Sequence, residues 1–502
     1  DLDITQKNKK HQRRGPSLSV AFDKNENPTQ ATVGFAKSCG VEVKELEKLE
    51  SGKGVWLVFN TILKGKKTNE IIPGLIEKSL GRLPIAKRMR WGNYNIEFVR
   101  PIKWILILFG KKTLNCEILG IKSGATSFGH RYHHPGALEI KSPSEYSNIL
   151  RSKGHVIVDY NERLSLIQSQ ISLAAKNNKG NAIIDPRLLD EVTSLVEWPV
   201  SFIGNFDPEF LKLPKEVLIT TMQDNQKYFP VTNDKKELMP LFVCVSNIES
   251  NNLELIKKGN ERVIRPRLSD AVFFWEWDLK YGLKNHRQSL KEVVYQKDLG
   301  TLYDKSERLI KTLSLIGEKI NLDIDSAKTA AALCLCDLLT KMVSEFPKLQ
   351  GTMGRYYAKA EGENNDVAIA LEELYQPRFA GDKLPKTLPG QCLAICEKID
   401  SLIGIFSIGK APTGDKDPFA LRRSAIGLLR IIIECKIDID LKDLLSTAAS
   451  TFSNKNQSLN CINDVYTFLM ARLRHYYRDE GFSADVFESV FAINISRPLD
   501  FH

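Results

Sequence analysis

The chain has 502 residues, of which 42% are hydrophobic and 26% are charged, a composition ample for several packed domains. Its nine cysteines are odd in number and scattered, which argues against a secreted disulfide framework and favours the reducing cytoplasm. No apolar run reaches the roughly 18 residues that a bilayer requires, so no membrane partner is expected. The 71 Lys and Arg outnumber the 61 Asp and Glu, giving a net charge of +10 that permits a polyanionic partner without requiring one.

The N-terminal half mixes strand-like and helix-like segments. The first 15 or so residues are polar and basic, which predicts a loop or a frayed start. Residues 55 to 155 predict strands, among them "GVWLVFNTIL", "IEFVRPIKWILILFG" and "HVIVDY". Helices are predicted at "SPSEYSNILRSKG", "YNERLSLIQSQISLAAKNNKG" and "PKEVLITTMQD", and further strands at "PVSFIGNF" and "LMPLFVCVSN". We therefore expect a mixed α/β half with domains at 1–160 and 161–285.

The C-terminal half is predicted to be helical throughout. Beyond about Glu276, apolar residues recur at spacings of three and four in "LYDKSERLIKTLSLIGEKI", "DSAKTAAALCLCDLLTKMVSEF", "DVAIALEELY", "QCLAICEKIDSLIGIF" and "PFALRRSAIGLLRIIIEC". This pattern predicts an all-α domain at 286–440 and the start of a further helical region at 441–502. The predicted fold class is therefore α+β and multidomain.

The stretch "IGKAPTGDKDPFALRR", residues 408–423, is a basic, glycine-containing loop. With Gly404 it satisfies G-x-x-x-x-G-K, the spacing of a phosphate-binding loop. A nucleotide site is not expected, because Ala411 stands where Ser or Thr would hold magnesium and a helix precedes the motif. We predict instead a tight loop followed by a helix, with Asp417 as its cap and Pro418 as its first residue. Such a loop is either a contact for a phosphate backbone or a constrained surface connection.

Residues 264–278, "IRPRLSDAVFFWEWD", combine arginines with aromatic residues. Arginine forks bind phosphates and aromatic faces stack on unpaired bases, which is how RNA ends and loops are held. The alternative, which this stretch alone favours, is a helix that packs its aromatic side in a core and leaves its arginines in solvent.

Two groups of potential metal ligands are better explained by packing. "GHRYHHPG" brings three histidines together without the Cys or carboxylate of a familiar zinc site. Cys334, Cys336, Cys392 and Cys396 lie in apolar helical runs, where free cysteine is a common core residue. We expect no metal in this chain.

The helical half also resembles HD-type phosphohydrolases, which bind a metal through an adjacent His-Asp pair and a distant Asp. In "LCLCDLLTKM", Cys336 stands where that histidine would be, before Asp337, and Asp400 is the candidate for the distant aspartate. No histidine occurs between His286 and His475. We therefore expect an HD-like domain with a degenerate metal site and without hydrolase activity.

Ten stretches, in one order from about Gly15 to Phe501, resemble the β subunit of the bacterial-type heterotetrameric glycyl-tRNA synthetase. They are "MRWGNYNIEFVRPIKWILIL", "GHRYHHPG", "DEVTSLVEWPVSFIGNF", "MQDNQKYFPV", "FVCVSNIES", "GNERVIRPRLSDAVFF", "YQKDLGTLYDKSERL", "EFPKLQGTMGRYYA", "PRFAGDKLP" and "PTGDKDPFALRR". Chains of this family begin earlier and continue into a helical anticodon-binding domain, so we expect this sequence to lack both parts.

The resemblance implies a division of labour between two subunits. Glycine, ATP and Mg would be used at the separate α subunit of an α2β2 heterotetramer, so we expect no catalytic residue and no cofactor in this chain. Its partners would be the α subunit and tRNA(Gly), which it would position for aminoacylation by the ligase. The alternatives are an HD-type metal-dependent phosphohydrolase and a pure assembly subunit. Charge and loop context suggest as tRNA contacts Arg262, Arg265, Arg267, Lys410, Lys416, Arg422 and Arg423.

Overall fold

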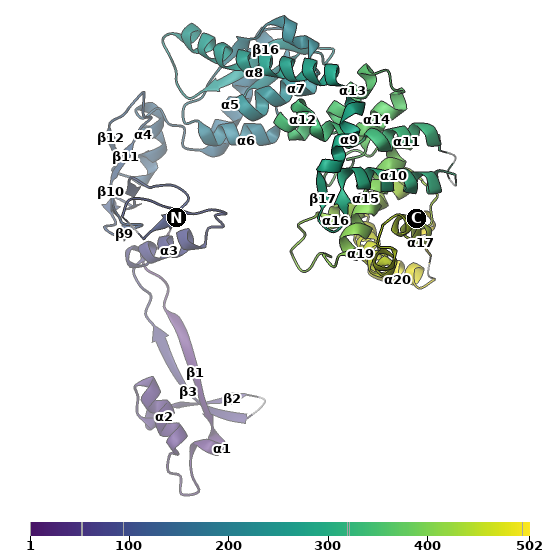
Figure 1. The fold of residues 1–502 in the computed structure, drawn as a ribbon. Helices are drawn as coiled ribbons and strands as arrows, with labels where there is room; N and C mark the ends of the chain where they lie inside the picture. The colour runs from purple at the N-terminus through teal and green to yellow at the C-terminus, as the bar shows by residue number, and fades with distance from the viewer. Residues whose placement is uncertain are drawn as a thin grey trace. The chain divides into compact units, whose positions relative to one another are not determined.

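The computed structural model describes residues 2–501 with the exception of 52, 53, 94, 319, 321 and 494. The chain divides into two compact units, Asp1–Arg163 with Val196–Trp198, and Leu164–Leu195 with Pro199–His502 (Figure 1). The first unit and the beginning of the second mix helices with small sheets, and the rest of the second unit is helical apart from the hairpin of β17 (Val294–Gln296) and β18 (Gly300–Thr301). The α+β fold class is therefore confirmed, whereas the finer division into four domains stays a prediction.

A three-stranded antiparallel sheet opens the first unit, in the order β1 (Lys9–Ser17), β3 (Gly54–Leu63) and β2 (Glu47–Ser51). Figure 1 shows β1 and β3 as a long two-stranded ribbon. The prediction of a loop or a frayed start over the first 15 residues is wrong from Lys9 on, because the pairing partner of β1 lies some 50 positions away and local sequence does not reveal it. Helices α1 (Leu18–Ala21) and α2 (Gln30–Cys39) follow β1.

The remainder of the first unit departs from the predicted run of strands. Residues 68–82 form helix α3 (Thr68–Arg82), because Ile72, Ile76 and Leu80 recur at a spacing of four and pack on the cluster around Ile107 and Ile118. "HVIVDY" forms no strand; the Ile157 N–H instead donates to the Glu197 carbonyl at 3.0 Å. The other elements are β4 (Met89–Arg90), β5 (Glu97–Phe98), β6 (Ile105–Leu106), β7 (Leu108–Phe109), β8 (Lys112–Thr113), β9 (Glu117–Ile118), β10 (Ile121–Gly124), β11 (Thr126–Phe128), β12 (Ala137–Glu139), η2 (Pro143–Glu145) and α4 (Tyr146–Ser152).

The second unit begins within α5 (Tyr160–Asn177) and contains an antiparallel sheet in the order β13-β15-β16-β14. The central pair is β15 (Phe229–Thr232) with β16 (Leu238–Ser246), and the edge strands are β13 (Asn181–Ala182) and β14 (Val200–Asn205). Helices α6 (Pro186–Leu195), α7 (Lys215–Thr220) and α8 (Leu253–Tyr281) accompany the sheet. The buried side of α8, with Ile264 and Leu268, packs into the same core as Phe202 and Phe242.

The helical part is built around α15 (Leu388–Ser407), which contacts α10 (Leu302–Gly317), α14 (Asn365–Glu373), α16 (Leu421–Glu434), α17 (Leu441–Ser450) and α19 (Ile462–Asp479). Most of α15 is buried, which explains its nearly continuous apolar sequence. The predicted helix at 325–346 is instead α11 (Ile324–Leu333), the 3-10 turn η7 (Cys336–Leu339) and α12 (Lys341–Glu345). Helices α13 (Thr352–Ala360), α18 (Lys455–Asn460) and α20 (Ala484–Phe491) complete this part.

Candidate nucleic-acid interface

The three arginines of α8 are exposed, and in the part of the chain that the structure describes none forms an ion pair. At 3.6 residues per turn, Arg262 and Arg265 lie on adjacent sides of the helix, while Arg267 is rotated by about 160° from Arg265. A single phosphate backbone running along α8 would therefore meet the first two arginines but not the third.

The aromatic residues of α8 mostly contact protein. Trp275 stacks on the buried ring of Tyr357 with centroids 5.1 Å apart, and Trp277 stacks on Tyr281 at 5.1 Å. The Lys341 ammonium group lies over the Trp277 ring, 4.4 Å from its centroid. Phe273, which is 57% exposed, is the ring on this helix that faces solvent most fully. The basic and aromatic groups of the stretch are thus largely separated in space.

The loop before α16 is held by its own aspartate. The Asp417 carboxylate accepts hydrogen bonds from the backbone N–H groups of Leu421 at 2.9 Å and Arg422 at 3.0 Å. The prediction that α16 begins at Pro418 is wrong, because Ala420 has φ +53° and the helix begins one residue later. The N-cap is Ala420 and not Asp417 as predicted, although the Asp417 carboxylate still binds the first two N–H groups of the helix. Lys410 and Lys416 are exposed on this loop and form no ion pair within the described residues.

Arg422 and Arg423 lie at the start of α16, and both donate to carbonyl groups rather than to carboxylates. Arg422 donates to the Gly414 carbonyl, and Arg423 Nη1 donates to the Arg378 carbonyl at 3.3 Å. Burial lowers the pKa of Arg472 on α19, and the nearby charge of Arg422 lowers that pKa further. The guanidinium groups of Arg422 and Arg472 are thus close enough to repel one another, which favours an anionic ligand beside them.

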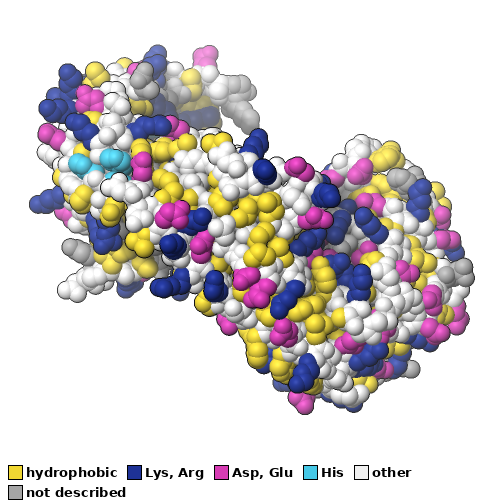
Figure 2. Space-filling model, turned by 90° about the horizontal axis from the view of Figure 1, so that it is seen from above, with side chains coloured by type: hydrophobic (Ala, Val, Ile, Leu, Met, Phe, Trp, Pro, Cys, Tyr) yellow, Lys and Arg dark blue, Asp and Glu magenta, His cyan; other side chains and the backbone are white. Residues whose placement is uncertain are grey.

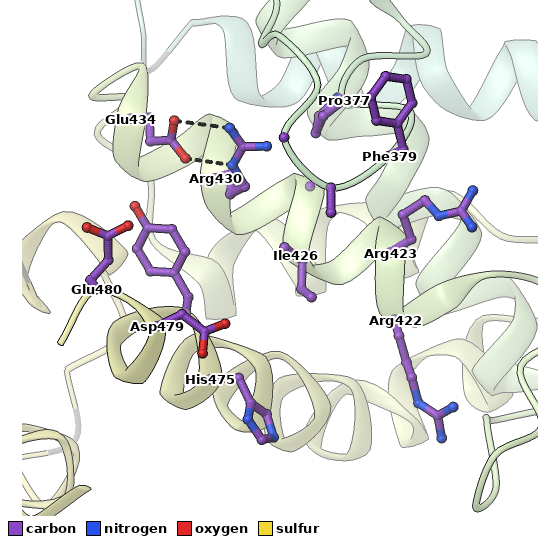
Figure 3. A pocket seen from close by; sticks show the side chains of 14 residues that line it. Pro377, Phe379, Arg422, Arg423, Ile426, Arg430, Glu434, His475, Asp479 and Glu480 are labelled. Atoms are coloured by element: carbon purple, nitrogen blue, oxygen red, sulfur yellow. Dashed lines mark hydrogen bonds and ion pairs between the residues drawn. The ribbon is translucent and has the colours of Figure 1, made fainter. Parts of the chain in front are cut away.

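A pocket of about 700 Å³ opens beside these arginines, between α16, α19 and residues 377–381 (Figure 3). Figure 3 shows Arg422 and Arg423 along one side of the pocket and the Arg430–Glu434 ion pair, 2.7 Å long, across from them. Phe379, 50% exposed, and Ile426, 40% exposed, give the pocket apolar surface. His475, Asp479 and Glu480 contribute from α19.

Sequence reasoning missed the residues that turn the α16 arginines into a pocket. Phe379 lies in "PRFAGDKLP" and His475 in "MARLRHYY", segments about 45 and 50 residues from the arginines with no local signal that they meet. The contact between α16 and α19 that joins them is a tertiary one. The one available signal in the sequence was an aromatic residue, Phe379, in a short segment between Pro377 and Gly381.

The positions compared with an HD-type metal site bind other groups. The buried Asp400 carboxylate accepts from Arg308 Nε at 2.6 Å and Nη2 at 3.1 Å. Asp337 accepts from the N–H groups of Gly351 at 2.5 Å and Gly354 at 3.1 Å, and burial raises its pKa to about 6. Cys336 is buried, and burial raises the pKa of its thiol to about 12.

Elsewhere, too, potential metal ligands serve packing. His130 is 3% exposed and its Nδ1 accepts from the N–H groups of Tyr132 and His133 at 3.1 and 3.2 Å. All nine cysteines are free thiols. Over the residues that the structure describes, no group of three or more His, Cys, Asp or Glu side chains is arranged to hold a metal ion.

Similarity to known proteins identifies the family. The chain matches the family described as "Glycyl-tRNA synthetase beta subunit" over residues 1–492. It belongs to that family. The glycine–tRNA ligase beta subunit of Hahella chejuensis is 47% identical over 490 residues, 98% of this chain and 71% of the relative. The corresponding subunits of Marinobacter nauticus and Colwellia psychrerythraea are 46% and 47% identical, each over 100% of this chain and over 72% and 73% of their own lengths.

Membership in the glycyl-tRNA synthetase beta subunit family confirms the resemblance that the ten stretches indicated. The relatives are named as one subunit of a ligase, so the family supplies one part of an enzyme complex. None of the helices in the described portion of the chain combines the length and apolar character needed to cross a membrane.

Proposed function

We propose that this chain is the tRNA-binding subunit of a cytoplasmic glycine–tRNA ligase. It would hold tRNA(Gly) so that the terminal hydroxyl reaches the aminoacylation centre of an α subunit, where ATP and Mg are used, in an α2β2 heterotetramer. Family membership supports the role as a ligase subunit. Correct placement of two reactants can lower a barrier by about 7–11 kcal/mol, so a subunit that performs no bond-making can still control the rate.

The cationic side of the α16 pocket is the observation that carries RNA binding. Arg422 and Arg423 are fixed by hydrogen bonds to carbonyl groups, which orient the guanidinium groups without neutralising them. Lys410 and Lys416 add two more exposed charges on the adjoining loop. Fixed guanidinium forks bind phosphate oxygens with little loss of entropy, because they are already oriented.

The pocket beside the arginines suits an unpaired nucleotide. The exposed ring of Phe379 offers a surface on which one base can stack, an interaction worth about 1–3 kcal/mol for single-stranded nucleic acid. A phosphate next to that base would lie toward Arg422 and Arg423. We therefore place a single-stranded segment of the tRNA, rather than a duplex, in this pocket.

The test measures tRNA(Gly) binding across salt concentrations for the double variant Arg422→Gln with Arg423→Gln. We expect affinity to fall at least about tenfold, since two charged hydrogen bonds are lost, and the slope of log K against log[salt] to fall by about 1 to 2. A matched control is Lys311→Gln with Lys359→Gln, which removes two exposed charges from α10 and α13. Equal affinity and slope for the wild type and the arginine variant would remove this pocket from the RNA-binding surface.

We do not propose a metal-dependent phosphohydrolase. Both oxygens of Asp400 are engaged by the guanidinium of Arg308, which occupies the position that a cation would take. A pure assembly role is separated from tRNA binding by the same titration, carried out with and without the α subunit. The assembly role would be favoured if this chain alone did not bind tRNA(Gly) and if its complex with the α subunit bound no more tightly than the α subunit alone.

A further inference from the structure

The ribbon of β1 and β3 carries charge of one sign. Residues 4–17 and 54–69 contain eight Lys and Arg and no Asp or Glu. This differs from the face of the molecule in Figure 2, where cationic and acidic side chains are intermixed. Over the whole chain the two kinds are nearly balanced, at 71 and 61, so the ribbon is a local exception.

Antiparallel pairing gathers the lysines of two distant segments. Lys9 pairs with Leu63 and Lys10 with Ile62. Beyond the strands, the Gln6 N–H donates to the Lys66 carbonyl at 2.9 Å, and the Gly65 N–H donates to Asn8 Oδ1 at 2.8 Å. The end of the ribbon from which the chain leads into α3 (Figure 1) therefore gathers six lysines: Lys9 and Lys10 at the start of β1, Lys7 just before it, and Lys64, Lys66 and Lys67 just after β3.

These six lysines are exposed, and none forms an ion pair within the described part of the chain. The two arginines of the ribbon differ, because each serves the fold. Arg13 donates to the Ser38 carbonyl at 2.8 Å, and Arg14 lies 3.9 Å from the centroid of the Trp56 ring. The carboxylates of the sheet, Glu47 and Glu50, are on β2, which pairs with the other half of β3.

From this arrangement we infer that the lysine end of the ribbon is a second contact for the phosphate backbone of RNA. The inference rests on the proposed tRNA-binding function, and it adds a site in the other compact unit. Lysine ammonium groups act as point charges for phosphate and do not read bases, so this contact is independent of sequence. Neighbouring residues of a strand lie on opposite faces, so Lys9 and Lys10 offer charge to a phosphate backbone on either face of the ribbon.

The rigidity of the ribbon adds to the argument. A flexible basic tail would lose conformational entropy when it bound RNA, whereas the backbone at Lys9 and Lys10 is fixed by pairing with β3, and Lys66 and Lys67 are held by backbone contacts to Gln6 and Thr5. The apolar neighbours Leu63 and Ile62, 51% and 60% exposed, lie opposite Lys9 and Lys10 and give their stems a surface to rest on.

The experiment compares the full chain with the triple variant Lys9→Gln, Lys10→Gln and Lys66→Gln in binding to tRNA(Gly) and to unrelated tRNA. We expect the variant to reduce the slope of log K against log[salt] by about 2 to 3 and to weaken both tRNAs alike. Replacement of the same three lysines by arginine should restore both values. The control Lys24→Gln, Lys37→Gln and Lys48→Gln removes three exposed charges from the same unit outside the ribbon and should leave the slope unchanged.

Three other results of this experiment would overturn either the inference or the proposed function. An unchanged slope in the ribbon variant, with normal binding by wild type, overturns the inference and leaves the proposed function intact. No tRNA binding by wild type, alone or with the α subunit, overturns the proposed function itself. A variant that keeps its tRNA affinity but no longer associates with the α subunit would show that the ribbon contacts an acidic protein surface, which also overturns the inference. Circular dichroism of each variant confirms that the fold is retained.

Discussion

Replacing Asp400 by Asn should destabilise the helical part strongly, because it leaves a buried cation without its partner. The side chains of Arg308 and Asp400 are 7% and 3% exposed and are joined by two hydrogen bonds, at 2.6 and 3.1 Å. Removing one member of a buried ion pair costs about 3–5 kcal/mol, most of it the uncompensated charge that remains. Lys305 keeps Glu397 at 2.8 Å, so Arg308 is the group left without a carboxylate.

Hydrogen exchange followed by mass spectrometry measures this cost where it arises. A loss of 3–5 kcal/mol should lower the protection of amides in α10 and α15, which carry Arg308 and Asp400, by roughly 10²- to 10⁴-fold. The exposed pair Arg430–Glu434 is the control, and Glu434→Gln should cost no more than about 0.5 kcal/mol.

A second variant distinguishes the loss of the pair from a general loss of packing. Arg308→Met with Asp400→Leu removes both charges and should recover much of the lost protection, since a buried pair replaced by apolar residues is often neutral. The reasoning would be refuted by Asp400→Asn leaving the protection of both helices unchanged. It would equally be refuted by the double variant being less stable than Asp400→Asn.

Three further predictions concern chemistry, pH and packing. The purified chain, given glycine, ATP and Mg, should not catalyse pyrophosphate exchange, and exchange that persists after the α subunit has been removed would contradict the assignment of catalysis to that subunit. Burial raises the pKa of Asp337 from 3.8 to about 6, so the folded state binds more protons than the unfolded state between these values; stability should fall as pH rises from about 4 to about 6, and Asp337→Asn should remove this part of the pH dependence of unfolding. Gly404→Ala should cost about 1–3 kcal/mol without altering tRNA affinity, because a Cβ there would lie 2.9 Å from Leu299 Cδ1; a selective loss of nucleotide or RNA binding would instead support a phosphate-binding loop.

Local patterns were sufficient for most of the helices. The apolar spacing within α10, α15, α16 and α19 predicts each of them, because an amphipathic helix buries one stripe against any neighbour and records that stripe in its own sequence. Turn residues located the loop before α16 and the aspartate that binds the first N–H groups of that helix, Asp417. The apolar spacing failed at α12, where buried Asp278 binds the first N–H groups of the helix from a segment more than 60 residues away.

Strands and sites depended on contacts that local sequence does not contain. Nothing within residues 1–15 indicates β1, since a strand is stabilised by its partner and the partner is β3. Asp400 could be placed on a helix from sequence, but only the fold shows that it binds Arg308 and not a metal. In the same way, Phe379 and His475 join the α16 arginines only through packing of separate segments.

The sequence by itself determined the family, the helical C-terminal half and the charges at the start of α16, because each is recorded in contiguous residues. Only the tertiary structure decided which charged side chains form ion pairs and which like-charged side chains come close together. Asp400 is matched by Arg308 across α10 and α15, whereas the lysines at the start of β1 are brought to the same end of the ribbon as those that follow β3. The physical reason is that electrostatic energy depends on distances in space, and pairing of distant segments sets those distances.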